Sequence, residues 1–267
     1  MTAPHRPSSP WRRAVAYELA RAQSLKSTWL LLVLASSLGL VALVDGSVYT
    51  HTAMGRSDYL AFGAVTAPVA SVALLCAVFG AMSGGHEFRH GTAATSLVLF
   101  PSRHDLLLGK VNGSALFAAA AAVSAMTVGL VALPLAGMGA VNATVLDDPA
   151  ALAGVALRGV LVCVGYATLG LACAVIGGSV VAGVAFPFVA SALVEPILVI
   201  GLGRSGLLRY AYPFTEARAG LSTGEAPLPF GGDVMRSSPW LSLVAFLVFC
   251  TVVAVLAALR FKRTNVN

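Results

Sequence analysis

Residues 240–259 read WLSLVAFLVFCTVVAVLAAL, a run without a single charge, and Arg260, Lys262 and Arg263 follow it almost at once. A helix needs about 20 mostly apolar residues to cross the hydrocarbon core of a bilayer, because each residue adds about 1.5 Å. This stretch therefore predicts a membrane-spanning helix. Trp240 would lie at one membrane interface and the basic residues at the other.

The composition of the whole chain agrees with a membrane protein. Of 267 residues, 58% are hydrophobic and 10% are charged, and the mean hydropathy is +0.86. A soluble domain carries about a quarter charged residues, and a disordered chain is poor in apolar ones, so both classes are excluded. The net charge of +6 comes from basic residues that are scattered among apolar blocks, which excludes a nucleic-acid partner. We expect an all-α integral membrane protein.

The remaining uncharged runs predict five further spans. Two of these runs are too long for one helix, and we place breaks after Pro134 and at Gly177-Gly178-Ser179. Residues 1–10 are expected to be disordered and residues 11–267 to form one transmembrane domain. The six expected spans are residues 28–45, 60–83, 111–134, 152–176, 180–201 and 240–259.

The distribution of Lys and Arg predicts the orientation. Most of these residues lie before residue 27, between the second and third spans, and in the C-terminal tail. Basic segments stay on the cytoplasmic side, so we expect both termini to be cytoplasmic. Without a turn at Gly177-Gly178-Ser179 the chain would have five spans and its basic tail would lie outside.

The segment before the first span has the pattern of an amphipathic helix. Apolar residues recur at helical spacing, whereas Arg12, Arg13 and Arg21 occupy the rest of the surface. Such a helix lies in the membrane interface with its apolar side in lipid. It is either a simple topology anchor or a functional elbow. Its expected apolar side consists of Trp11, Val15, Leu19, Ala22 and Leu25.

The segment of residues 84–110 is too polar and too interrupted to be a span. A short helix across the cytoplasmic face would present Glu87, Arg89 and Thr92 to a partner, while Leu97 and Leu99 pack against a protein or membrane surface. The alternative is an ordinary charged loop. His86 and His90 have the spacing of a metal pair, but glycines flank them and we predict no metal site. The four cysteines lie in apolar runs and predict neither a disulfide frame nor a metal site.

Three segments resemble the ABC type-2 transporter permeases of high-GC bacteria. One is Glu18-Leu-Ala-Arg21 with Lys26-Ser-Thr-Trp29, before the first span. The second, Glu87-Phe-Arg89-His-Gly91-Thr92 with Leu97, Pro101, Arg103 and Lys110, is similar to that family's Glu-x-Arg-x-Gly-Thr stretch. The third is the C-terminal span from Ser238-Pro-Trp240 to Arg260-Phe-Lys-Arg263. The family's Arg-Asp ending is not matched, since Arg263-Thr-Asn-Val stands there.

The resemblance implies the transmembrane permease subunit of an ATP-driven exporter in a bacterial cell membrane. In that family an interfacial elbow helix precedes the first span, and the segment after the second span is a coupling helix that docks on an ABC ATPase. The chain has no Gly-x-x-x-x-Gly-Lys-Ser/Thr loop, so ATP and Mg would be bound by that partner and the chain itself is not an enzyme. The residues implied for coupling are Glu87, Arg89, Gly91, Thr92 and Arg103.

The resemblance also implies an assembly with a second, identical permease subunit, in which small residues such as Ala118–Ala122 and Gly165–Gly170 allow close helix packing. Two ionisable residues are candidates for the translocation path. Glu195 lies within the fifth expected span, and it either faces an aqueous path or belongs to a water-exposed helix break. Arg158 either pairs with Glu195 or extends outward to the interface, which is the cheaper arrangement.

The long loop of residues 202–239 is expected outside, either as short helices over the outer mouth or without structure. A drug, a peptide or a lipid-like molecule is the expected cargo. The alternative function is a non-transport membrane scaffold or anchor, in which residues 87–110 dock some other cytoplasmic partner.

Overall fold

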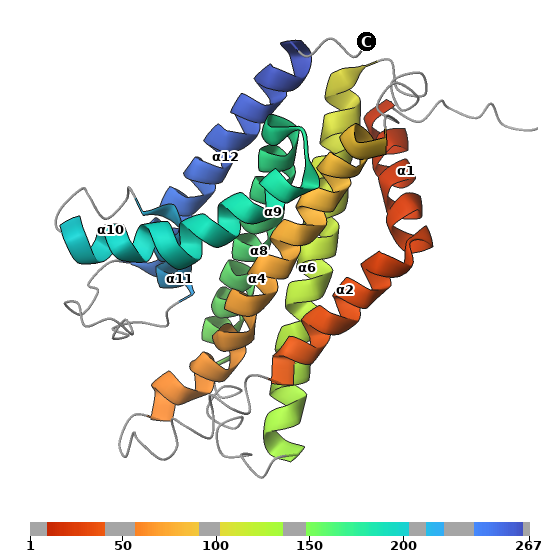
Figure 1. The fold of residues 1–267 in the computed structure, drawn as a ribbon. Helices are drawn as coiled ribbons and strands as arrows, with labels where there is room; N and C mark the ends of the chain where they lie inside the picture. The colour runs from red at the N-terminus through yellow and green to blue at the C-terminus, as the bar shows by residue number, and fades with distance from the viewer. Residues whose placement is uncertain are drawn as a thin grey trace, which may run out of the picture.

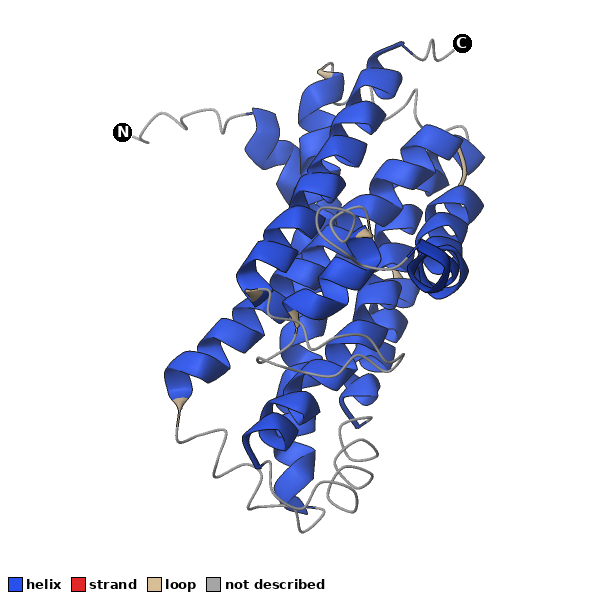
Figure 2. Ribbon diagram, turned by 90° about the vertical axis from the view of Figure 1, so that its left-hand side faces the viewer, coloured by secondary structure: helices blue, strands red, loops and turns tan. Residues whose placement is uncertain are grey.

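The structure is a computed structural model, and it describes residues 10–40, 57–90, 102–135, 148–202, 212–221 and 238–263. These residues form a helical bundle (Figures 1 and 2). The helices in chain order are α1 (Pro10–Ser24), α2 (Lys26–Ser37), the 3₁₀ turn η1 (Leu38–Leu40), α4 (Ser57–His90), α6 (Arg103–Leu135), α8 (Pro149–Gly177), α9 (Val180–Val189), the π-helix η2 (Ala190–Val194), α10 (Glu195–Leu202), α11 (Pro213–Gly220) and α12 (Pro239–Arg263).

Five helical stretches in the described part are long and apolar enough to cross a membrane, which indicates a multi-pass membrane protein. They are Pro68–His86, His104–Ala132, Pro149–Gly177, Val180–Gly201 and Pro239–Lys262.

The first expected span, residues 28–45, is described only as far as Leu40. There α2 has 12 residues and η1 has 3, which together measure about 24 Å, less than the hydrocarbon thickness of about 30 Å. The count of six therefore stays a prediction. The expected disordered N-terminus lies outside the described residues except for Pro10, which begins α1.

The helix break expected at Gly177-Gly178-Ser179 is present. Gly178 has φ of 65°, the left-handed conformation that glycine adopts at least cost, and it ends α8. The Ser179 hydroxyl then accepts a hydrogen bond from the Ala182 N–H at 3.2 Å and caps α9. At the other end of α8, the Asp148 carboxylate accepts from the Ala151 N–H at 2.9 Å, so both ends of this helix are fixed by local chemistry.

Small residues bring the central helices α4 and α8 into close contact. A Cβ atom added at Gly80 would collide with the Ala167 backbone, and one added at Gly170 would collide with the Ala77 backbone. Because no side chain separates the two backbones there, α4 and α8 form the centre of the bundle. The stretches expected to allow close packing are used within this one chain, since Gly165 packs against Phe246 and Ala118 is fully buried.

Both described ends of the chain lie at the same end of the bundle (Figure 1). The start of α6, the end of α8 and the end of α12 share one buried apolar cluster there, which includes Leu106, Val175 and Phe261. We call this the α1 end, because α1 packs on the first turns of α6. The described Lys and Arg residues of α1, of the end of α4, of the start of α6 and of the end of α12 lie at the α1 end, whereas Lys26, Arg158 and Arg218 lie on other segments.

Two helices extend further at the α1 end than the sequence predicts. We expected the second span to end at residue 83 and a separate short helix to carry Glu87 and Arg89, but α4 continues without a break to His90. Gly84 and Gly85 do not end the helix because they pack tightly, Gly84 against Leu171 of α8 and Gly85 against Val180 of α9.

The third span begins at Arg103, about two turns before the expected residue 111. With 34 residues in α4 and 33 in α6, the two helices measure about 51 Å and 50 Å, well above the thickness of the hydrocarbon core.

Candidate functional site

A buried ionic cluster joins three helices at the α1 end. The Lys110 ammonium of α6 lies 2.9 Å from Glu18 Oε1 of α1 and donates to the Ser83 carbonyl of α4 at 3.1 Å. Arg21 lies 3.6 Å from the other oxygen of Glu18. Only 4% of the Lys110 side chain and 6% of the Glu18 side chain are exposed. A buried charge is tolerated only with a close partner, so this cluster fixes α1 in place on the bundle.

Two glycines of α6 create the space for this cluster. A Cβ atom at Gly109 would lie 2.9 Å from the Ala14 backbone, and one at Gly113 would lie 3.2 Å from the Glu18 Cβ. The Gly-x-x-x-Gly spacing therefore lets α1 approach α6 closely and directs Glu18 onto Lys110.

The buried side of α1 differs from the expected apolar side. We expected Trp11 and Leu25 to belong to the side in lipid, and both are indeed exposed, but the side that packs on the protein carries Ala14 and the charged Glu18. The helical pattern leaves Glu18 off the expected apolar side, and hydropathy alone cannot reveal that this charged residue is buried together with its partner Lys110.

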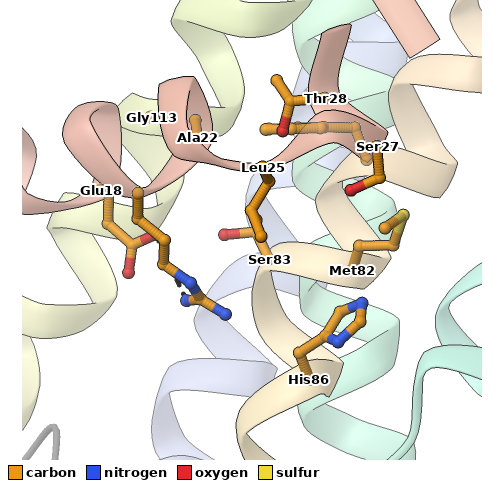
Figure 3. Close-up of a pocket in the computed structure, with 11 residues that line it drawn as sticks. Glu18, Ala22, Leu25, Ser27, Thr28, Met82, Ser83, His86 and Gly113 are labelled. Atoms are coloured by element: carbon orange, nitrogen blue, oxygen red, sulfur yellow. Dashed lines mark ion pairs between the residues drawn. The ribbon is translucent and has the colours of Figure 1, made fainter. Parts of the chain in front are cut away.

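A cavity of about 120 Å³ lies beside this cluster, below the bend between α1 and α2 (Figure 3). The bend is at Leu25, whose backbone is extended with φ of −90° and ψ of 121°. Figure 3 shows Leu25 above Ser83, with Met82 and His86 on the neighbouring helix. The residues lining the cavity are Glu18, Arg21, Ala22, Leu25, Ser27, Thr28, Phe79, Met82, Ser83, His86 and Gly113.

A second buried polar site is centred on Glu195. This carboxylate begins α10 directly after the π-helix η2, it is 5% exposed, and its Oε1 accepts a hydrogen bond from the Phe214 N–H at 2.8 Å. Phe214 lies in the first turn of α11, so Glu195 caps that helix. A π-helix inside an α-helix is frequent at functional sites. The burial of Glu195 argues against a water-exposed break, although the helix is irregular directly before it, and its place in a translocation path stays a prediction.

Helix α11 inserts among the spans. Phe214 packs on Tyr166 of α8 with ring centroids 5.6 Å apart and on Phe249 of α12 at 6.1 Å. Residues 213–220 therefore form a short helix, the first of the two expected alternatives, but they lie inside the bundle and not only over its mouth. As a result Glu216 of α11 is fully buried, at 0% exposed. A cavity of about 40 Å³ is lined by residues of several of these helices, among them Tyr166, Ser191 and Ala217.

Arg158 is buried on α8, at 7% exposed. Its Nε donates to the Gly154 carbonyl at 3.2 Å, and its guanidinium carbon lies 5.5 Å from the centre of the Trp240 ring. The side chain extends towards the end of the bundle where α8 and α12 begin, which is the direction expected for the interface, but it packs on Trp240 there and is buried. Pairing between Arg158 and Glu195 stays a prediction.

The expected coupling residues lie at or beyond the ends of two helices. Glu87 and Arg89 belong to the last two turns of α4, and Arg103 is the first residue of α6. Gly91 and Thr92 lie outside the described residues, as does most of the segment between them and α6. Packing at Gly84 and Gly109 brings the ends of α4 and α6 to the α1 end, next to the ionic cluster.

Sequence reasoning missed Glu18, Lys110 and Glu216 as candidate functional residues. The Gly109-x-x-x-Gly113 pattern around Lys110 is a signal that could have found the first two, because it marks a close helix contact on that side of α6. For Glu216 we find no such signal, since its burial depends on how α11 inserts among distant helices.

No family model matches this chain, and no curated protein matches it. Among the described residues there is also no group of three or more His, Cys, Asp or Glu side chains that could hold a metal ion.

Proposed function

We propose that this chain is the transmembrane permease subunit of an ABC exporter, which forms the translocation path and is driven by a separate ATPase subunit. The observation that carries the proposal is the construction of the α1 end. The ends of two long helices, α4 and α6, meet there, and the buried Glu18–Lys110 pair attaches an N-terminal helix to them. A rigid end of this kind can receive force from a partner and pass it to helices that cross the membrane.

The charges at the α1 end support its assignment to the cytoplasmic side. Described basic residues gather there, as expected for segments that stay in the cytoplasm. Glu87 and Arg89 at the end of α4, with Arg103 at the start of α6, would be the first groups that a docked ATPase meets. ATP and Mg would be bound in that partner, because this chain has no phosphate-binding loop.

Buried ionisable residues support a transport path. Glu195 and Glu216 are buried beside α8 and α12, and acidic groups inside a membrane bundle usually mark the route of an ion or a polar substrate. Large apolar residues are exposed on α2, on α9–α10 and on α12, where a second copy of the chain or lipid would cover them. We propose a drug, a peptide or a lipid-like molecule as the cargo.

Purification of the tagged chain from its native membrane tests the proposal. We expect a P-loop ATPase to co-purify in a fixed ratio, and we expect Glu87→Ala with Arg89→Ala to weaken this association while membrane insertion is retained. Lys262→Ala is the matched control, because it removes an exposed charge at the same end of the bundle from a different helix. A chain that purifies without an ATPase but with another cytoplasmic protein would favour the scaffold alternative.

A further inference from the structure

The cavity below the bend of α1 and α2 is held open by the helices around it. The two helices form an angle whose apex points away from α6 (Figure 1). The indole N–H of Trp29 donates to the Gln23 carbonyl at 2.9 Å, which fixes the bend. The Glu18–Lys110 pair fixes α1 on one side of the bend, and Ser36 of α2 contacts Ser124 of α6 at 3.0 Å on the other. The cavity is therefore preformed.

The walls of the cavity are apolar on one part and polar on another. Leu25, Phe79 and Met82 supply apolar surface, whereas Arg21 and His86 supply groups that can bind an anion or donate a hydrogen bond. The volume of about 120 Å³ is close to that of a cavity of about 150 Å³ that holds benzene in another protein. A short segment of an acyl chain fits this space. Such walls suit an amphipathic molecule better than a purely polar one.

The charges around the cavity favour an anionic head group. Glu18 is the only acidic residue of α1, and it lies against two cations, Lys110 and Arg21, so these three groups together carry one net positive charge. About a quarter of the Arg21 side chain is exposed, so an incoming group can reach it. Basic pockets between membrane helices on the cytoplasmic side bind the head groups of anionic lipids.

The level of the cavity along the bundle selects a lipid as the occupant. On α4 the apolar residues give way at His86 to the mostly polar run of residues 86–90, and α6 begins with the charged Arg103 and Asp105. The cavity therefore lies where apolar helix surface ends, at the level of the lipid head groups. We infer that this cavity binds an anionic phospholipid, with its phosphate at Arg21 and His86 and the first part of an acyl chain against Leu25, Phe79 and Met82. The inference does not depend on the proposed transport function.

Native mass spectrometry of the full chain in detergent tests this site, with phosphatidylglycerol and phosphatidylcholine of equal chain length as probes. We expect phosphatidylglycerol to bind more tightly, and we expect Arg21→Gln to reduce that preference about fivefold, which corresponds to one basic group near the lipid phosphate. Arg21→Lys keeps the charge and should retain most of the preference. Ala22→Phe fills the cavity and should weaken both lipids.

Arg12→Gln is the matched control, because Arg12 is exposed on the same helix and stacks on Trp11 outside the cavity. An equal loss in Arg12→Gln would overturn the proposal, since it would show only general attraction between a basic helix and anionic lipid. Displacement of the lipid by millimolar inorganic phosphate would also overturn it, because the site would then bind a small anion and not a lipid. The absence of any preference for phosphatidylglycerol in the wild-type chain would overturn it as well.

Discussion

Removal of the Lys110 ammonium should release α1 from the bundle. In Lys110→Met the Glu18 carboxylate stays 6% exposed, but it loses the cation at 2.9 Å, and the Ser83 carbonyl loses its donor at 3.1 Å. Breaking a buried ion pair costs about 3–5 kcal/mol. Because Arg21 remains 3.6 Å from Glu18, we expect the low end of that range, about 3 kcal/mol. This cost falls on the docking of α1, since α1 can detach while the central helices stay packed.

Hydrogen exchange of the α1 amides measures this docking. A change of about 3 kcal/mol should raise the fraction of detached α1 roughly a hundredfold, so exchange between Ala14 and Arg21 should accelerate strongly in Lys110→Met. The double variant Glu18→Leu with Lys110→Met should restore most of the protection, because an apolar pair of similar volume removes both charges together. Lys26→Met is the control, since Lys26 is an exposed cation at the start of α2. Equal exchange in Lys110→Met and the wild type would refute the reasoning.

Three further predictions concern the centre of the bundle, the second polar group and the topology. Gly170→Leu should prevent stable accumulation in the membrane, because a side chain there collides with the α4 backbone. Gly154→Leu should be tolerated, because nothing lies within 4 Å of a Cβ atom added there. Fluorescence size-exclusion profiles compare the two variants. Glu195→Ala should lower stability by about 1–3 kcal/mol, since it leaves a buried N–H of α11 without its acceptor. Glu195→Gln should cost less. Normal thermal melting of the alanine variant would count against the role of Glu195 as the cap of α11. A cysteine at Ala150 should react with an impermeant thiol reagent on intact cells and one at Ser24 should not, and the opposite pattern would invert the orientation.

The membrane class and the all-helical fold could be predicted from the sequence, because they follow from apolar runs and from local helix signals. The break at Gly178 was predictable for the same reason, since a glycine with positive φ and the serine cap at Ser179 act within a few residues. Gly84 and Gly85 carry the same local signal, yet α4 continues through them. Their surroundings decide the outcome, because Leu171 and Val180 pack directly on them.

The ionic cluster could not be predicted, because a charged side chain normally indicates a solvated position and only tertiary contacts show that it is buried. Glu18 and Lys110 have the local pattern of solvated residues, and only the contact between α1 and α6 buries them together. Arg158 is a similar case, since its partner Trp240 lies on a helix that is distant in sequence. Of the expected coupling residues, Glu87 and Arg89 lie near the end of α4 and Arg103 begins α6. The partner that they would contact could not be predicted, because it depends on contacts that a single chain does not contain.

The central claim is that this chain transmits the energy of ATP hydrolysis by a partner subunit, and ATPase activity of the complex extracted from the membrane tests it most directly. We predict that ATPase activity co-purifies with the chain. This activity should disappear when the phosphate-binding lysine of the partner is substituted. We also predict that Glu87→Ala with Arg89→Ala lowers this activity while the chain still inserts. A chain that is stable, correctly inserted and purified from its native membrane without any associated ATP hydrolysis would contradict the claim.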